Sequence, residues 1–204
     1  VVFDPDSATI RLVANGRTLA RQGGVENFWR APTGIDEGTH ADCNAGVWRA
    51  AGLDRLRRTV LAADWSPVGE SEALFRTVTD LCAADREVGI RSQMEFRLSA
   101  DGLLRIAHAV HVAEGLPDIP RIGQTWTLDG SLQRLSWFGR GPHENYADRK
   151  GSALVGLYES TVDAQHFDYI LPVECGGKED VRWVALRDAH GDGILFASPA
   201  LFHF

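Results

Sequence analysis

The sequence is poor in cysteine and contains no long apolar run. Its three cysteines, Cys43, Cys82 and Cys175, are an odd number at wide spacing with no CxxC pair, which argues against a disulfide framework or a zinc site. We therefore expect reduced thiols and a cytoplasmic protein. No stretch approaches the roughly 18 apolar residues that a membrane-spanning helix needs, so we expect no contact with a membrane.

Clustered positive charge is also missing. The chain has 21 Lys and Arg against 28 Asp and Glu, a formal charge of −7, and no basic tract. Phosphate neutralisation needs a clustered positive surface, so nucleic acid is not an expected partner.

Self-sufficient catalytic and metal-binding signatures are absent as well. The sequence has no GxSxG, GxGxxG or Walker pattern, each of which would point to a particular chemistry. His108 and His111 stand three apart on an expected strand, where side chains alternate between faces. They cannot share a metal ion there, and we expect no metal site in this chain.

Alternating hydrophobicity predicts strands over most of the chain. Asn15-Gly16 lies between apolar flanks and predicts a type I′ hairpin, because both residues tolerate positive φ. Residues 91–98 alternate apolar and polar, Asp101-Gly102 turns the chain, and the alternation resumes over residues 104–112. We expect further strand-turn-strand units over residues 122–139, around Asp129-Gly130, and over residues 181–198.

The fold class follows from this pattern. Residues 45–60 form the one convincing helical segment, with Trp48, Leu53 and Leu56 near one face. Many strands at short spacing with one short helix predict an all-β antiparallel sandwich. We expect a single domain over residues 1–204. The start at Val1 without Met leads us to expect an excised piece. Residues 196–204 still read as a strand, so we expect either a chain that is incomplete at its C-terminus or a final edge strand that something else covers.

Three polar loops carry most of the chemistry, over residues 27–48, 138–149 and 169–183. Each joins aromatic rings to charged side chains, a mixture that sugar recognition uses. The same residue types also tie down irregular backbone, and the residues alone leave both interpretations open.

The acidic side chains of these loops give no distinctive carboxylate pair. A retaining glycosidase needs two carboxylates about 5–5.5 Å apart. The candidates are Asp36 with Glu37, Glu144 with Asp148, and Glu174 with Glu179 and Asp180.

Four ordered motifs resemble one known family. They are FWRAPT (residues 28–33), PRIG (120–123), WFGRGPHENYADR (137–149) and PVECGGKEDVRW (172–183). In this order they closely resemble the small-chain region of bacterial LacZ-type β-galactosidases of glycoside hydrolase family 2.

The resemblance implies both a fold and a role. In that family the region is a C-terminal β-supersandwich, galactose-mutarotase-like in fold, which packs on a TIM barrel that carries both catalytic glutamates. Neither glutamate's motif occurs here, so the resemblance implies no catalytic residue in this chain. It implies part of a β-galactosidase with the barrel as partner and a β-galactoside as substrate, and it allows a homo-oligomer. We expect no cofactor in this chain, and we expect any Mg or Na of the parent enzyme to be bound in its other domains.

The resemblance also nominates site residues. The segment after RAPT forms a mobile flap in relatives, and it matches Gly34 to Asn44. The sequence reads RAPTGID where relatives usually read RAPTDND, so Asp36 is the surviving acid. The flap candidates are Gly34, Asp36, Gly38, His40 and Asn44. The candidate sugar-facing or structural polar residues are Arg30, His143, Glu144, Asn145, Asp148, Arg149 and Glu174.

We expect PHENYADR (residues 142–149) to be mainly a structural and interdomain loop. In this hypothesis Arg149 pairs with Asp148, Asn145 caps the turn, and Tyr146 packs while hydrogen-bonding through its hydroxyl.

Two alternatives remain open. One is an aldose 1-epimerase on the mutarotase-like fold, with His143 and Glu174 as acid and base. The other is a stand-alone sugar-binding module.

Overall fold

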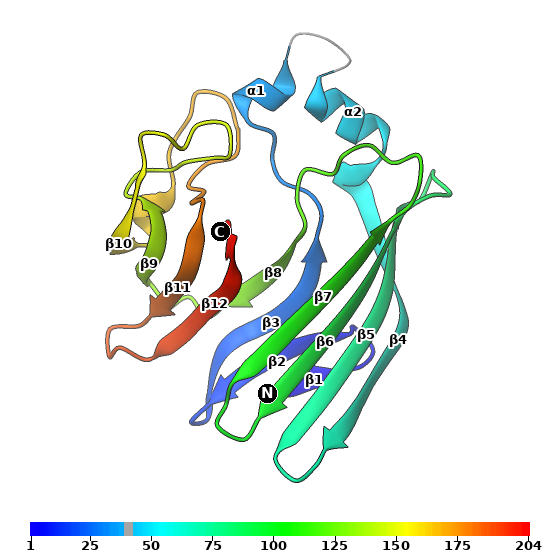
Figure 1. The fold of residues 1–204 in the computed structure, drawn as a ribbon, viewed down its shortest axis with the longest axis vertical. Helices are drawn as coiled ribbons and strands as arrows, with labels where there is room; N and C mark the ends of the chain where they lie inside the picture. Colours follow the sequence, from blue (N-terminus) through cyan, green and yellow to red (C-terminus); the bar gives the residue numbers. More distant parts are fainter. Residues whose placement is uncertain (39–42) are drawn as a thin grey trace. The chain divides into compact units, whose positions relative to one another are not determined.

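The computed structural model describes residues 1–38 and 43–204. Within these residues the chain forms strands β1 to β12, helices α1 and α2, and two short 3₁₀ helices (Figure 1). The pairings along β1-β2-β3, along β4-β5-β6-β7 and along β10-β9-β11-β12 are antiparallel. The chain divides into two compact units. Unit 1 comprises Val1–Arg30 and Ile35–Thr127, and unit 2 comprises Ala31–Gly34 and Leu128–Phe204. The expectation of a single domain stays a prediction.

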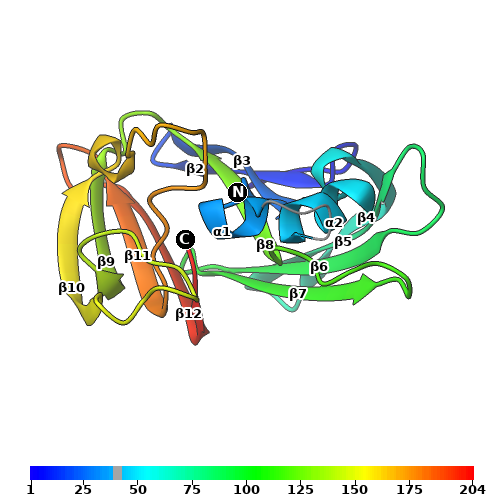
Figure 2. The same cartoon turned by 90° about the horizontal axis from the view of Figure 1, so that it is seen from above.

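Unit 1 is built from two four-stranded sheets. One has the order β1-β2-β3-β8, with β1 at Val2–Asp4, β2 at Thr9–Ala14, β3 at Arg17–Asn27 and β8 at Gly123–Leu128. The other has the order β4-β5-β6-β7, with β4 at Leu56–Val68, β5 at Glu72–Ala83, β6 at Ile90–Ser99 and β7 at Leu104–Val112. Figure 2 shows the two sheets as layers. Ile10, Phe75, Met94 and Phe96 are buried in one core cluster that joins strands of both sheets.

The predicted hairpins of unit 1 are confirmed. Asn15 and Gly16 have φ values of +51° and +75°, as a type I′ turn requires, and Ala14 pairs with Arg17 across them. Leu98 pairs with Leu104 around the Asp101-Gly102 turn. In these two hairpins the turn residues and the apolar pattern beside them agree with the observed pairing.

The predicted helix over residues 45–60 is wrong in its second half. Helix α2 covers Asn44–Ala50, a 3₁₀ turn covers Leu53–Arg55, and β4 begins at Leu56. Gly52 adopts the left-handed conformation, with φ at +81°, and so ends the helix. A second short helix, α1 at Gly34–Glu37, was not predicted.

Unit 2 contains the third sheet, in the order β10-β9-β11-β12. Its strands are β9 at Arg134–Gly141, β10 at Leu154–Thr161, β11 at Val181–Arg187 and β12 at Gly193–Phe202, and a 3₁₀ turn covers Asp163–Gln165. The predicted pairing of β11 with β12 is confirmed. The predicted pairing across Asp129-Gly130 is wrong, because β8 and β9 belong to different sheets.

The register of this sheet brings two polar loops to the same end. Strand β9 runs antiparallel to β10 and to β11. The end of β9 at Gly141 and the start of β11 at Val181 therefore lie at the same end of the sheet (Figure 1). The loop after β9 and the loop before β11 therefore meet there. Leu135, Trp137, Val181 and Val184 form the buried core of the sheet beside them.

Candidate functional site

Glu144 joins the two polar loops of unit 2. Its Oε1 atom accepts a hydrogen bond of 2.7 Å from Arg149 and another from the hydroxyl of Tyr169, and its Oε2 atom accepts one of 2.8 Å from the backbone N–H of Gly176. The expected pairing of Arg149 with Asp148 is thus wrong. Arg149 reaches back across the loop to Glu144, whereas Asp148 is exposed beside it.

The carboxyl group of Glu144 is held in its charged form. Burial is the largest single influence and by itself would raise the pKa of Glu144. The hydrogen bonds from Tyr169, Gly176 and Arg149 together outweigh it, and the pKa lies below its usual value. A carboxylate held this way is a poor general acid near neutral pH.

Asn145 and Tyr146 fasten the loop of residues 142–149 to the Gly176-Gly177 segment. Asn145 is fully buried; its backbone N–H donates to Gly177 O, and its side chain accepts from the backbone N–H of Glu179, both at 2.8 Å. The Tyr146 hydroxyl accepts from the backbone N–H of Gly177 at 3.3 Å. Tyr146 thus packs and hydrogen-bonds through its hydroxyl as expected, whereas Asn145 binds across to the other loop. That Asn145 caps the turn, and that either residue faces a sugar, stay predictions.

Lys178 is a buried cation that sequence reasoning missed. Its ammonium group donates to Gly176 O at 2.8 Å and lies 5.4 Å from the centre of the Trp137 ring. Burial lowers the pKa of Lys178, against the opposing effect of Glu144. Lysines are mostly exposed, so nothing in the sequence singled this one out.

Asp180 forms ion pairs with residues at both ends of the loop after β9. Its carboxylate lies 2.5 Å from Arg140 Nε and 2.8 Å from Lys150 Nζ. Hydrogen bonds from Lys150 and Arg140 lower its pKa. Asp180 has a φ of +52°, a conformation that Asp tolerates better than most residues.

The remaining candidates of unit 2 occupy separate positions. His143 is exposed, and its Nε2 lies 3.1 Å from Ser152 Oγ. Glu174 is partly buried, and its backbone N–H donates to Pro32 O at 3.2 Å.

In unit 1 the polar candidate Arg30 lies beside the flap candidates Asp36 and Asn44. Arg30 Nη1 lies 2.6 Å from Asp36 Oδ2, and Asn44 Nδ2 donates to Asp36 Oδ1 at 3.4 Å. The Arg30 guanidinium also stacks over the Trp48 ring, 5.2 Å from its centre. Asp36 is buried. We call the group formed by Arg30, Asp36, Asn44 and Trp48 the flap cluster.

The other flap candidates differ in what the structure shows. Gly34 is the first residue of α1, and a Cβ added there would contact nothing within 4 Å. Gly38 has a φ of +41°, and a Cβ added there would lie 2.7 Å from Cys43 Cβ. His40 lies outside the described residues.

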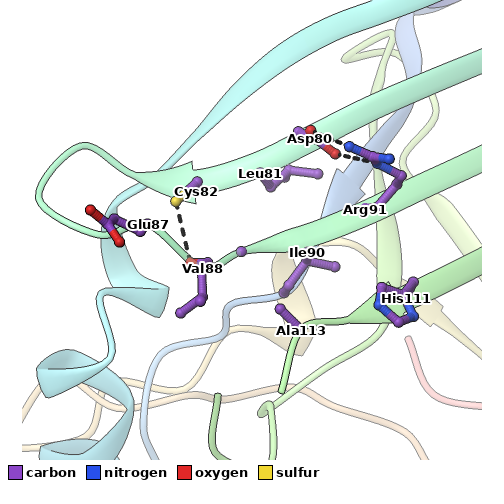
Figure 3. A pocket seen from close by; sticks show the side chains of 10 residues that line it. Asp80, Leu81, Cys82, Glu87, Val88, Ile90, Arg91, His111 and Ala113 are labelled. Carbon is purple, nitrogen blue, oxygen red and sulfur yellow. Dashed lines mark hydrogen bonds and ion pairs between the residues drawn. The ribbon is translucent and has the colours of Figure 1, made fainter. Parts of the chain in front are cut away.

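A separate hollow of about 380 Å³ lies in unit 1 at the hairpin between β5 and β6 (Figure 3). Arg91 pairs there with Asp80 at 2.7 Å, and the Cys82 thiol donates to Val88 O at 3.2 Å. His111 faces this hollow, on the opposite face of β7 from the partly buried His108. None of the predicted site residues lines it.

Most of the acidic candidates are bound to cations. Asp36 pairs with Arg30, Glu37 with Arg49, Glu144 with Arg149, and Asp180 with Arg140 and Lys150. Such carboxylates favour positioning and recognition over proton transfer.

Three further observations concern the described part of the chain. No group of three or more His, Cys, Asp or Glu there could hold a metal ion, and the three cysteines form no disulfide. The helices described are too short to span a membrane.

The whole chain, residues 1–204, matches the family model described as "Beta galactosidase small chain". Three curated relatives carry the name "Beta-galactosidase". The one from Priestia megaterium is 33% identical over 87% of this chain, the one from Vibrio cholerae 36% over 82%, and the one from Aeromonas hydrophila 34% over 92%. The chain spans only 16%, 17% and 19% of their lengths, respectively.

Proposed function

The chain belongs to the family of β-galactosidase small chains, and from this premise we propose that it is the accessory part of a β-galactosidase. The enzyme would hydrolyse terminal β-D-galactosyl residues with retention of configuration, as in lactose catabolism in the cytoplasm. This chain would pack on a catalytic barrel and shape the sugar site without supplying a catalytic glutamate. The match of residues 1–204 with the family model, together with the relatives of that name, carries the proposal.

The arrangement of carboxylates supports an accessory role. Retaining hydrolysis needs one carboxylate as nucleophile and one carboxylic acid as proton donor. Glu144 accepts three hydrogen bonds, and Asp180 bridges two cations. Their lowered pKa values oppose protonation, so neither suits the role of the acid. We propose that any Mg or Na the enzyme uses is bound in its other domains.

The flap cluster is the part of this chain that we propose faces the sugar. Arg30 and Asn44 hold the buried carboxylate of Asp36, and Trp48 lies beneath the guanidinium. Planar charged groups and aromatic rings are the side chains that grip sugar hydroxyls and C–H faces. The cluster would fix the ends of the flap rather than react.

The two alternatives need different observations. An epimerase requires an acid and a base across one sugar ring, and mutarotation of galactose by the chain alone would establish it. A stand-alone sugar-binding module would show saturable binding of galactose by the chain alone.

The substrate proposal is tested on the intact polypeptide that carries residues 1–204. We expect it to hydrolyse p-nitrophenyl β-D-galactoside faster than the α-galactoside or the β-glucoside, and NMR should show β-galactose as the first product. Preference for the β-glucoside, or α-galactose as first product, would overturn it.

A further inference from the structure

One short loop of unit 2 exposes an unusual concentration of apolar side chains. Within Phe167–Leu171 the exposed fraction is 59% for Phe167, 101% for Ile170 and 72% for Leu171, and the Tyr169 ring is partly exposed. Single exposed apolar residues are ordinary on soluble proteins. Four large ones in five consecutive residues mark a contact surface. We call this segment the apolar loop.

The apolar loop is held in place from within. The Phe167 and Tyr169 rings pack with centres 4.6 Å apart, and the backbone N–H of Tyr169 donates to Phe167 O at 3.0 Å. Because this packing is local, the Phe167 and Tyr169 rings are already ordered before any partner binds. Association then loses less conformational entropy than it would for a random coil.

The apolar loop overlaps the start of the polar loop of residues 169–183, and hydrogen bonds tie it to both polar loops of unit 2. The Tyr169 hydroxyl donates to Glu144, and His166 Nδ1, just before the loop, lies 3.7 Å from Cys175 Sγ. The other ring nitrogen of His166 lies 2.9 Å from Asp168 Oδ1. The Glu144 network therefore positions the apolar tip as well as the backbone around it.

The size of the loop and the length of the relatives indicate what covers it. A standard protein interface uses roughly 20–30 residues on each side, so a five-residue loop is too small to hold a second copy by itself. A partner in the same polypeptide needs less contact area, because the tether raises its effective concentration. More than four fifths of each relative lies outside the matched segment.

We propose that the apolar loop docks into an apolar pocket on the remaining part of the same polypeptide. The side chain of Asp168 is 97% exposed and puts a negative charge beside the tip, so the rim of the pocket carries Lys or Arg. The proposal rests on the proposed function in one respect, namely that this chain is part of a long polypeptide like its relatives.

Hydroxyl-radical footprinting of the intact polypeptide tests the docking. In the folded protein we expect Ile170 and Leu171, the two most exposed residues of the loop, to be oxidised several-fold more slowly than in the urea-unfolded protein, at every protein concentration. Oxidation at the rate of the unfolded protein would overturn the proposal. Protection that disappears on dilution would overturn it too, because a second copy would then be the occupant.

A pair of variants gives an independent test. Ile170→Ser combined with Leu171→Ser should lower the Tm of the intact polypeptide and expose the loop to protease. Leu154→Ser is the matched control, because Leu154 is also 72% exposed in unit 2, and it should change neither. Equal behaviour of the two variants would contradict the docking.

The same preparation separates this proposal from the proposed function. Protection of the loop without hydrolysis of β-galactosides would leave the docking intact and overturn the activity. Hydrolysis without protection would overturn the docking alone.

Discussion

Arg149 reaches back five residues to Glu144, with its Nη2 atom 2.7 Å from Glu144 Oε1. The same carboxylate binds Tyr169 and the backbone of Gly176. One side chain thereby closes the loop of residues 142–149 and joins it to the loop before β11. The stability of unit 2 should therefore depend on Glu144 more than on Arg149 or Asp148.

Replacing Glu144 by Ala should lower the free energy of unfolding by about 2–4 kcal/mol, because it leaves the Gly176 N–H and two side-chain donors without their acceptor. Arg149→Ala should cost only about 1 kcal/mol, since half of that side chain is exposed. Asp148→Ala is the control and should stay within roughly 0.5 kcal/mol of the parent. Urea unfolding followed by circular dichroism measures all three, and a larger loss for Asp148→Ala than for Glu144→Ala would contradict the network.

Stability at acid pH should depend on Glu26 in unit 1. Its side chain is buried, and it accepts hydrogen bonds of 2.5 Å from Arg58 and 2.6 Å from Thr79. Burial, the largest influence, would raise the pKa of Glu26, but these bonds lower it below 4.5. A lowered folded-state pKa stabilises above the unfolded value, and this contribution is lost as pH falls through the folded value.

Glu26→Gln should therefore lower stability at pH 7 by about 3 kcal/mol and flatten the fall in stability below pH 4.5. Unfolding curves from pH 7 to pH 3 test both effects. An unchanged slope in the variant would show that other carboxylates carry the acid dependence.

Tyr146 should make stability fall at alkaline pH. Burial raises its pKa from 10.0 to about 12. Its contribution is thus fully present below pH 10 and is lost as pH rises through about 12. Tyr146→Phe should unfold with a shallower pH dependence above pH 10, and the difference absorbance titration against the parent should show one tyrosinate forming near pH 12. A midpoint near 10 would contradict the buried hydroxyl.

Gly177 should not tolerate a side chain. A Cβ there would lie 2.6 Å from His203 Cε1 and 2.8 Å from Tyr146 Cε1. Gly177→Ala should cost about 1–3 kcal/mol through overpacking. Gly151 has open space at its Cβ position, so Gly151→Ala serves as the control and should shift the urea midpoint very little; equal losses would contradict the close packing.

The flap cluster should affect substrate binding more than chemistry. In the intact polypeptide, Asp36→Asn should raise KM for a β-galactoside by roughly five- to tenfold, about 1–1.4 kcal/mol, with kcat nearly unchanged, because it weakens a binding surface rather than a transition-state contact. Glu37→Gln alters the neighbouring exposed pair with Arg49 and should leave KM unchanged. A fall in kcat for Asp36→Asn with constant KM would place Asp36 in the chemistry.

The sequence predicts local strand pairing well and long-range pairing poorly. Asn15-Gly16 fixes its hairpin because its positive φ values suit only one kind of turn. Asp129-Gly130 marks a turn equally well, but a local turn cannot specify which sheet the next strand joins. The spacing of Trp48, Leu53 and Leu56 suggested one long helix, whereas Gly52 and the β-branched pair Thr59-Val60 favour the observed break and strand.

The candidate site shows the same limit. The motifs located the polar loops, but adjacent charges suggested that Arg149 pairs with Asp148. Partners across a loop depend on its folded path, which brings Glu144 rather than Asp148 to Arg149. Lys178 was missed because its burial arises from the sheet beneath it, through Trp137, and leaves no local signal.

The measurement that tests the central claim most directly is hydrolysis of a chromogenic β-galactoside by residues 1–204 alone, and after mixing with the remaining part of the polypeptide. The account predicts activity only in the mixture, because this chain positions the site and the other part supplies the carboxylates. Hydrolysis by residues 1–204 alone would contradict it and would make Asp36, Glu144 and Glu174 the first residues to test as catalytic.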